Sequence, residues 1–379
     1  MMKLFPTTEN MYQFVLFWTF FGLVFFQVIY VCLFFGRLAF RKIRPQKTEF
    51  PPVSIVICAR NEADNLYEKL PKILLQNYPA PFEVIVVNNQ SVDDSKHLLY
   101  AMQRESKNLV IVEMERSKHI RPSKKLPLTL GIKKAQYNHL LLTDADCLPN
   151  SNEWIQSMVS CFSEKKQLVL GYSPYTKQKG FLNKVIRFDT TMIAVNYFSM
   201  AINRIPYMGV GRNLAYTKTL FESVDGFKSH YSIPSGDDDL FVQEAAKKNN
   251  YTIQLDPKSF VETDPKETWE DFITQKARHY TTSPKYSFIK KVMLGIYPTS
   301  SLMLLISFIT LLLEVEWRWH AAAGLVLVIL LKWWFLGKCF SKLKSSSFIG
   351  LLPFLDLIYV ICLPFFYYSI MQKKRSTWK

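Results

Sequence analysis

Charge is absent from a long stretch near the start of this sequence. The run from 11 to 36 contains no Lys, Arg, Asp or Glu and is dense in Phe, Leu and Val. A membrane-spanning helix needs about 20 predominantly apolar residues. A cleaved secretory signal would be shorter and would end at a small-residue cleavage site, which does not follow this run. The segment therefore predicts a membrane anchor.

Paired cysteines are also lacking. The chain has 6 cysteines and no CxxC pair, so the spacing indicates neither a zinc site nor a redox motif. Cys32, Cys339 and Cys362 lie in apolar segments, and Cys58 lies in a strand-like run. We interpret the cysteines as small apolar residues in a reducing compartment.

Acidic residues are fewer than basic ones: 31 Asp and Glu stand against 47 Lys and Arg, a net charge of +16. Such an excess can indicate a nucleic-acid partner. Here much of it flanks apolar segments, where anionic lipid attracts each basic residue by about 1 kcal/mol. We therefore expect a membrane surface, and no nucleic acid, as the partner.

Three further apolar segments follow residue 290. They cover 292–313, 319–337 and 348–371, and the last two contain Lys332 and Asp356. The composition between them and the first segment is mixed, as in a water-facing domain. We expect an N-terminal anchor with a basic linker at 1–48, a globular domain at 49–290, and C-terminal transmembrane or interfacial helices at 291–379.

Basic residues set the expected orientation. Clusters follow the first apolar segment and precede the second: Arg37, Arg41, Lys42, Arg44 and Lys47, then Lys285, Lys290 and Lys291. Both clusters predict a cytoplasmic globular domain in a multi-pass protein of the plasma (inner) membrane. Basic residues on both sides of the last apolar segment indicate the inside, and a full span over 348–371 cannot satisfy both: Lys338, Lys342 and Lys344 before it, and Lys373-Lys374-Arg375 after it. That segment either spans the membrane or is re-entrant or interfacial.

The globular domain shows short apolar runs that end in polar loops. Val53–Ile57 and Val84–Val87 are two such runs, and "NLVIVEME" and "HLLLTDADC" are two more. Buried strands alternating with helical stretches predict an open α/β sheet. Ligands of such sheets bind beyond the carboxyl ends of the strands, where these polar loops lie.

Asp144 and Asp146 lie at the end of the "HLLLTDADC" run. Alternate side chains of an extended segment share one face, so both carboxylates can approach one cation. Mg²⁺ in proteins typically takes one or two carboxylates together with substrate phosphates. The pair predicts a site for Mg²⁺ or Mn²⁺, with a solvated loop pair as the alternative.

Five segments carry a family resemblance: "PPVSIVICARNE", "VIVVNNQSVDD", "LLLTDADC", "SGDDDLFVQEA" and "QKARH". Their order and spacing resemble membrane-anchored glycosyltransferases of family 2, a group similar to ceramide glucosyltransferase and to the cellulose and hyaluronan synthases. The resemblance covers 51 to about 280. It implies a GT-A fold, an open mixed α/β sheet flanked here by transmembrane helices.

The resemblance also implies donor-binding residues. Ala59 and Glu62 match the loop that touches the nucleoside. Asn88 and Asn89 stand where the family usually has an acid pair. An Asn oxygen can still accept a hydrogen bond from a base, and a UDP-sugar is the expected donor. Lys124, beside Lys125, matches the basic residue that meets the diphosphate, with solvated surface as the alternative.

The acids in "PSGDDDL" match the family's general base. When the family's spacing is counted back from Leu240, Asp237 falls at the position of the base, with Asp238 next. When it is counted back from Tyr251, Asp239 falls there instead. Gly236 stands where many relatives have Glu. Asp residues at a helix N-terminus are also stabilised by the helix dipole, which is the alternative explanation for the run.

The helix that Thr268 caps, in a capping-box pattern, carries Gln275 and Arg278 on one face. They match the diphosphate clamp of the family's Q-x-x-R-W motif, and His279 replaces its tryptophan. The resemblance places Gly211, Asn213 and His279 on the acceptor side. For the apolar stretch 181–205 we favour core packing over a membrane-facing entrance for a lipid acceptor.

Together these features predict an inverting, metal-dependent transfer of a sugar from a nucleotide sugar to a lipid or lipid-linked acceptor. A processive polysaccharide synthase is the first alternative, and the loss of the tryptophan at His279 weighs against it. The second alternative is a catalytically degenerate membrane scaffold. Asn88, Asn89 and Gly236 favour it, and the intact acid pair weighs against it.

Overall fold

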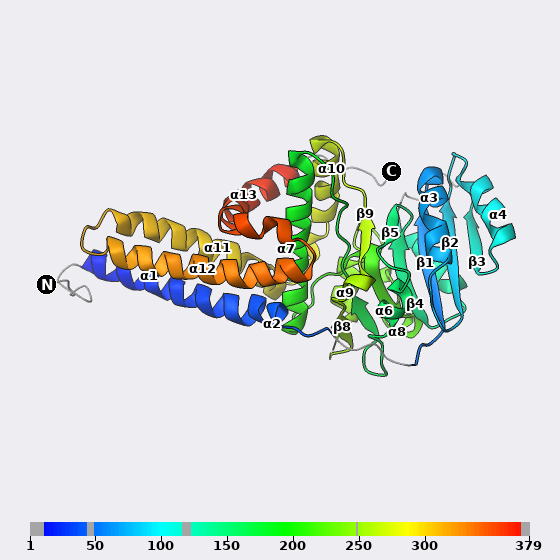
Figure 1. Cartoon of the computed structure of the whole chain (residues 1–379), viewed down its shortest axis with the longest axis horizontal. Coiled ribbons are helices and arrows are strands. Elements are labelled where there is room, and N and C mark those ends of the chain that lie inside the picture. The colour runs from blue at the N-terminus through cyan, green and yellow to red at the C-terminus, as the bar shows by residue number, and fades with distance from the viewer. Residues whose placement is uncertain (1–10, 44–48, 116–122, 248, 373–379) are drawn as a thin grey trace. The chain divides into compact units, whose positions relative to one another are not determined.

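The structure, a computed structural model, describes residues 11–43, 49–115, 123–247 and 249–372. The chain divides into two compact units. Residues 42–285 form the α/β unit, and the segments up to 41 and from 286 to 372 form the membrane unit. Figure 1 shows the elements of both.

The α/β unit is built on a seven-stranded mixed sheet with the order β3-β2-β1-β4-β7-β6-β8. The pairs β3-β2, β2-β1, β1-β4 and β6-β8 are parallel, and β7 is antiparallel to both β4 and β6. The strands are β1 Val53–Ala59, β2 Phe82–Asn89, β3 Leu109–Met114, β4 His139–Asp144, β6 Leu168–Leu170, β7 Leu214–Thr217 and β8 Tyr251–Ile253. A two-stranded sheet pairs β5 Cys147–Pro149 with β9 Val261–Thr263. The predicted open mixed α/β sheet is confirmed.

Helices cover both faces of the sheet, because its central strands are apolar on both sides. Alternate residues of β1, such as Val53 and Ile55, share a buried cluster with side chains of α3, α4 and α6. On the other face Gly131 of α5 approaches Val56 and Val87 so closely that a Cβ there would lie 2.6 Å from Val56. The helices of this unit are α3 Ala63–Leu74, α4 Ser95–Glu105, α5 Lys125–Lys134, α6 Trp154–Val159, α7 Phe181–Ile202, α8 Lys218–Ser223, α9 Asp239–Ala245 and α10 Trp269–Tyr280.

Two sequence predictions about helices are confirmed. Thr268 caps α10 by accepting a hydrogen bond from the backbone N–H of Asp271 at 3.1 Å. Helix α7 buries many of its side chains, including Ile186, Met192 and Phe198, as expected for core packing. Its Asp189 also forms an ion pair with the buried Lys276 of α10.

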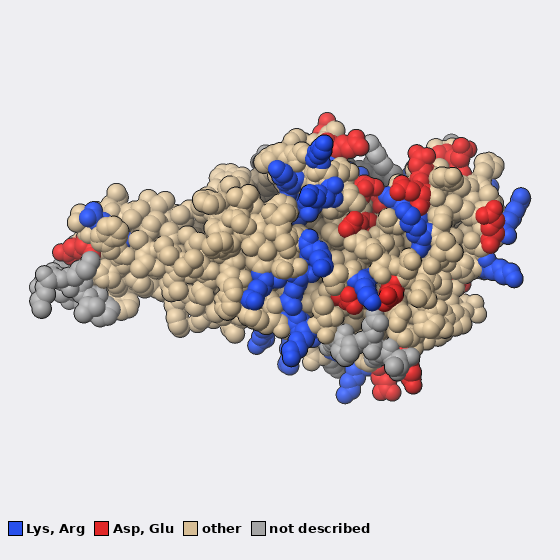
Figure 2. Space-filling model, in the orientation of Figure 1, with Lys and Arg blue, Asp and Glu red and all other residues tan. Residues whose placement is uncertain are grey.

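The membrane unit consists of four long apolar segments. They are α1 Met11–Tyr30, which continues through a π-helical turn at Val31–Phe35 into α2 Gly36–Ala39, then α11 Phe288–Leu312, α12 Arg318–Lys342 and α13 Leu352–Gln372, which follows a 3₁₀ turn at Ser346–Leu351. Each of the four segments is long and apolar enough to cross a membrane. On the face shown in Figure 2, the surface of α1, α11 and α12 is largely free of charged side chains. The apolar segments predicted from composition are therefore all helical.

Candidate functional site

The candidate site lies where three parallel strands end. In the sheet register Ala59 pairs with Asn88, and Cys58 pairs with Asp144. The polar loops after β1, β2 and β4 therefore start side by side at one edge of the sheet. This is the edge at which ligands of open α/β sheets bind.

The two acids after β4 converge, although not in the way the sequence suggested. Asp144 is the last residue of β4, Ala145 and Asp146 form a turn, and Cys147 begins β5. The predicted extended segment is therefore wrong at this point, because the chain must turn to pair β5 with β9. Even so, carboxylate oxygens of Asp144 and Asp146 and the sulfur of Cys147 all lie within 4.8 Å of one another.

Lys124 lies between Asp144, a candidate metal ligand, and Asp237, the candidate general base. Its ammonium group forms an ion pair with Asp144 and lies 3.5 Å from the carboxylate of Asp237. Burial raises the pKa of Asp144, but the charges of Lys124, Arg212 and Arg278 outweigh burial and hold that pKa below its usual value. Asp144 is therefore a carboxylate at neutral pH, as a metal ligand must be.

Lys125, the next residue, has a different role. It is fully buried, and its ammonium group donates to the backbone carbonyls of His230 at 2.6 Å and Ile233 at 3.0 Å. Burial lowers its pKa to about 8. Lys125 therefore supports the loop before the acid run, and solvated surface describes neither lysine.

The three acids of 237–239 have separate environments. Asp237 faces Lys124. Asp238 precedes α9 and accepts from the backbone N–H of Asp239 at 2.7 Å and of Gly211 at 3.0 Å. Asp239 is buried, accepts from the N–H of Leu240 and is hydrogen-bonded to the hydroxyl of Thr282. Burial, then the charges of Asp237 and Asp239, raises the pKa of Asp238 to about 7.

Two glycines shape the space around these acids. Gly236 has a φ of 100°, and a Cβ there would lie 2.7 Å from Leu240. This loop therefore requires glycine, whatever relatives have at the position. A Cβ on Gly211 would lie 3.5 Å from both the Asp237 carboxylate and the Lys124 ammonium. The absence of a side chain at Gly211 leaves both groups uncovered on that side.

The loops after β1 and β2 are joined by hydrogen bonds. The backbone N–H of Glu62 donates to Ser95 at 3.1 Å, and that of Ala63 donates to Asp93 at 3.0 Å. Asp93 has a lowered pKa, since the hydrogen bonds from Ser95 and Ala63 outweigh the burial that would raise it. The loop expected to touch a nucleoside is thus held in place by its neighbour.

The other predicted donor-side residues lie at the same strand ends. Ala59, Asn88 and Asn89 are buried, and Glu62 is half-buried. The amide of Asn88 donates to Glu113 of β3 at 2.9 Å. The side chains of Asn88 and Asn89 are therefore largely enclosed within the strand ends of the fold.

Two arginines add positive charge. Arg278 of α10 and Arg212, in a 3₁₀ turn at Gly211–Asn213, both lower the pKa of Asp144, after Lys124. The guanidinium of Arg212 stacks 4.7 Å from the ring centre of Tyr175, and Tyr175 also donates to Gln275 at 3.3 Å. The structure thus brings Gln275 and Arg278 to the same region, while His279 is exposed.

Asn213, predicted on the acceptor side, is a core residue. It is fully buried. Its amide donates to the carbonyls of Tyr172 and Ser259 at 2.8 and 2.7 Å and accepts from Trp154 at 3.1 Å. With these contacts made, the side chain is not available to an acceptor.

Sequence reasoning missed three residues: Lys69, Cys147 and Arg212. Burial, followed by the charges of Asp146 and Asp144, raises the pKa of the Cys147 thiol, which donates to Asp146 at 3.3 Å. The spacing of Cys147 directly after the acid pair could have indicated its position. For Lys69 and Arg212, nothing in the sequence indicates that they lie beside these acids.

The acid turn, residues 144–147, suits a hard divalent cation. Carboxylate oxygens are the ligands that Mg²⁺ and Mn²⁺ prefer, and an oxygen of Asp144 lies within 4.8 Å of an oxygen of Asp146. Both residues are partly exposed. Lys124 and Arg278 lie nearby with the charge needed to bind phosphate.

Comparisons with known proteins identify the family. The family model described as "Glycosyltransferase like family 2" matches residues 51–282. A poly-beta-1,6-N-acetyl-D-glucosamine synthase of Staphylococcus aureus (strain MSSA476) is 26% identical over 100 residues, which are 26% of this chain and 23% of that protein. Glycosyltransferase AglE of Haloferax volcanii is 30% identical over 115 residues, which are 30% of this chain and 36% of that protein. The matched segments therefore span only about a quarter to a third of these relatives.

A solved structure supports the fold. Mannosyltransferase PcManGT from Pyrobaculum calidifontis, in complex with GDP-Man and Mn²⁺, superimposes with a TM-score of 0.55 at 16% sequence identity. The match covers 90% of this chain and 97% of that one. The sheet order, the family match and this neighbour agree: the chain belongs to the glycosyltransferase-like family 2 and has a GT-A fold.

Proposed function

We propose that this glycosyltransferase moves a sugar from a nucleotide diphosphate sugar to a hydroxyl of a lipid or lipid-linked acceptor, with inversion at the sugar carbon. One observation carries the proposal. The carboxylates of Asp144 and Asp146 converge at the carboxyl ends of the parallel strands, beside Lys124. This is the arrangement that a divalent cation and a diphosphate need in order to share a site.

Asp144 and Asp146 would hold Mg²⁺ or Mn²⁺. When bound, the ion supplies charge that stabilises the leaving diphosphate. Lys124 and Arg278 are expected to add charge-assisted hydrogen bonds to phosphate oxygens. Glu62, Asn88 and Asn89, with the backbone at Ala59, would border the nucleoside, and Gln275 would support the diphosphate side.

One of the acids at 237–239 is expected to accept the proton of the acceptor hydroxyl. Asp237 is the proposed base: it would accept the proton of the acceptor hydroxyl while that oxygen bonds to the sugar carbon and the bond to phosphate breaks. Its position beside Lys124, on the side that Gly211 leaves uncovered, favours this choice. Asp238 is the second candidate, because its pKa of about 7 suits a base at neutral pH. Asp239, unlike the other two, is buried, and its carboxylate is hydrogen-bonded to Leu240 and Thr282.

We further propose that the protein is a multi-pass protein of the inner membrane with the α/β unit in the cytoplasm. Four helices apolar enough to span a membrane and the basic residues flanking them support this. In sealed membrane vesicles of known orientation, added protease should digest the α/β unit only when the cytoplasmic side faces outward. Digestion from the opposite side would reverse the orientation.

A processive synthase is the second candidate, since one relative is a polysaccharide synthase. His279, exposed where the family motif has tryptophan, weighs against it. Product length separates the two: a non-processive enzyme adds one sugar per acceptor, and a synthase releases long chains.

A thermal-shift screen of the detergent-purified protein tests the donor. UDP-, GDP- and CMP-sugars would each be added with and without Mn²⁺. A ligand that binds only the folded state adds about 2.7 kcal/mol at 100 times its Kd, and we expect the UDP-sugar to show this shift only with Mn²⁺. Failure of all nucleotide sugars to bind would instead support the scaffold alternative.

A further inference from the structure

Lys69 of α3 is a buried lysine next to the acid turn. Only 4% of its surface is exposed. Lysine is almost never buried unless its charge is paired, because desolvation of an ammonium group is costly. The residues of α3 that share its face, Leu66, Leu70 and Ile73, pack into the core. A lysine among them therefore calls for a specific explanation.

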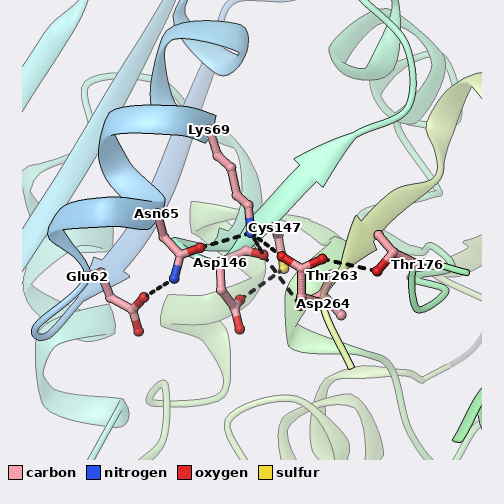
Figure 3. Close-up of polar contacts among 8 residues, drawn as sticks. All are labelled: Glu62, Asn65, Lys69, Asp146, Cys147, Thr176, Thr263 and Asp264. Atoms are coloured by element: carbon pink, nitrogen blue, oxygen red, sulfur yellow. Dashed lines mark hydrogen bonds and ion pairs between the residues drawn. The ribbon is translucent and has the colours of Figure 1, made fainter. Parts of the chain in front are cut away.

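The ammonium group of Lys69 has three acceptors from three different segments (Figure 3). It donates to Asn65 Oδ1 at 2.9 Å, to the backbone carbonyl of Asp146 at 2.9 Å, and to Asp264 Oδ2 at 2.8 Å. An ammonium group has three N–H donors, so each donor can have one acceptor. Helix α3, the turn after β4 and the end of β9 thus meet at one atom.

One of the three acceptors, the Asp146 carbonyl, belongs to the acid turn. The same Asp146 carbonyl has only one other hydrogen-bond donor among the described residues, the Thr263 hydroxyl at the longer distance of 3.4 Å. The Asp146 carboxylate accepts from Cys147 at 3.3 Å. Lys69 therefore makes the shorter of the two hydrogen bonds to the Asp146 carbonyl, and this bond joins the Asp146 backbone to α3.

The other two acceptors extend the network in opposite directions. Asn65 donates to the carboxylate of Glu62 at 2.7 Å, at the loop expected to touch the nucleoside. Asp264 accepts from the Thr176 hydroxyl at 3.0 Å, and the hydrogen bond from Lys69 is the main cause of its lowered pKa. The contacts drawn in Figure 3 thus connect the carboxylate of Glu62 to the acid turn through Asn65 and Lys69.

We propose that Lys69 is a positioning residue that fixes the Asp146 turn against α3 and so sets the distance between the two metal-binding carboxylates. This inference rests on the proposed metal role of Asp144 and Asp146. Lys69 acts through the backbone of Asp146 and does not contact the ion itself. Outer contacts of this kind typically change metal affinity by about 10–100-fold when they are removed.

The sign of the effect distinguishes positioning from simple electrostatics. A positive charge near a cation site repels the cation, so loss of the Lys69 charge alone should tighten Mn²⁺ binding. Loss of a positioning contact should weaken it. The two explanations therefore predict opposite changes for the same substitution.

The test compares Lys69→Met with a matched control, Lys258→Met, in the full-length detergent-purified protein. Lys258 also pairs with an acid, Glu153 at 2.7 Å, but its side chain is 49% exposed. Mn²⁺ affinity would be measured in the presence of UDP from the electron paramagnetic resonance of free Mn²⁺. We expect Lys69→Met to weaken Mn²⁺ binding about 10–100-fold and Lys258→Met to leave it unchanged.

Two further variants guard against misfolding of Lys69→Met. Lys69→Arg keeps the charge but cannot place a single nitrogen among three acceptors, so it should also weaken Mn²⁺ binding, in a protein that still melts cooperatively. Asp264→Ala removes one acceptor at a side chain that is 58% exposed, and its effect should be smaller and of the same sign.

The outcomes separate this inference from the proposed function. Unchanged or tighter Mn²⁺ binding by both Lys69 variants would overturn the positioning role and leave the metal site intact. Absence of Mn²⁺ binding by the unsubstituted protein would overturn the metal site and this inference with it.

Discussion

Both units of the protein place a lysine beside aspartate, but the balance of charge around the two lysines differs. In the membrane unit Lys332 faces Asp356 at 3.3 Å, one cation to one anion. Tyr297 donates to Asp356 at 2.6 Å, and Lys332 donates to Ser301 at 3.0 Å. Each charge there has its complement within the protein.

In the α/β unit the acids outnumber the lysine between them. Lys124 faces both Asp144 and Asp237, and Asp146 and Asp238 lie just beyond. Adjacent carboxylates repel one another and raise a pKa, as they do for Asp238. A balanced pair leaves no charge unpaired for a ligand, whereas an excess of acids leaves room for an added cation. We therefore propose a catalytic role for the acids around Lys124 and a structural role for the pair of Lys332 and Asp356.

The largest expected effect is at Asp144. Asp144→Asn removes one charge from the metal-binding pair, and we expect metal-dependent transfer to fall by about 10³-fold, the upper end for loss of one electrostatic contact in a transition state. Transfer of labelled sugar with Mn²⁺ present would measure it. Glu153→Gln, at a partly exposed acid that pairs with Lys258, is the control. Full activity in Asp144→Asn would remove the metal role and the contrast between the two clusters.

The membrane pair should instead affect stability. Lys332→Met leaves Asp356 buried without its cation, and breaking such a pair costs about 3–5 kcal/mol. Thermal unfolding in detergent should show a lower melting temperature for this variant and recovery in Lys332→Met/Asp356→Leu, since an apolar pair of similar volume is often neutral. A double variant that folds but does not transfer sugar would show that this pair has a functional role as well.

The pKa of Asp238 predicts a pH effect on stability. Its folded pKa of about 7 lies above the usual value of 3.8, so between these values the folded state binds more protons than the unfolded state. Stability from this group is present below pH 3.8 and is lost as pH rises toward about 7. Asp238→Asn should flatten that decline in a series of melting curves. An unaltered pH dependence would mean that the pKa of Asp238 is not raised.

The same variant helps to identify the base. If Asp238 rather than Asp237 accepts the proton, kcat/KM of the unsubstituted enzyme should rise with pH through about 7 and Asp238→Asn should abolish transfer. If Asp237 is the base, as proposed, Asp238→Asn should retain most of its transfer activity, and Asp237→Asn should lose it.

The smallest expected effect is at His279. His279→Trp restores the ring of the family motif, and a stacking ring should change acceptor preference more than donor affinity. Competition between acceptors at a fixed donor concentration would measure the preference. A change confined to donor KM would mean that His279 lies on the donor side.

Local pattern was enough to locate β1 to β4 and the acid pair that follows β4. The apolar runs at Val53–Ile57 and Val84–Val87 lie within β1 and β2, because buried parallel strands are apolar on both faces. The turn at Ala145 and Asp146 was missed, because it forms only when β5 pairs with β9, more than 100 residues later.

What the sequence by itself determined is the division of the chain into apolar and mixed segments, the positions of the first four strands along the chain and the end of the sheet at which polar residues gather. These properties follow from short-range periodicity and from strand direction. Tertiary structure alone decided that Lys125 donates to the backbone of His230, that Asp239 is buried while Asp237 faces Lys124, and that Lys69 meets Asp146. Such choices depend on which distant side chains pack together, and one residue's shift along a helix redirects a side chain by about 100°.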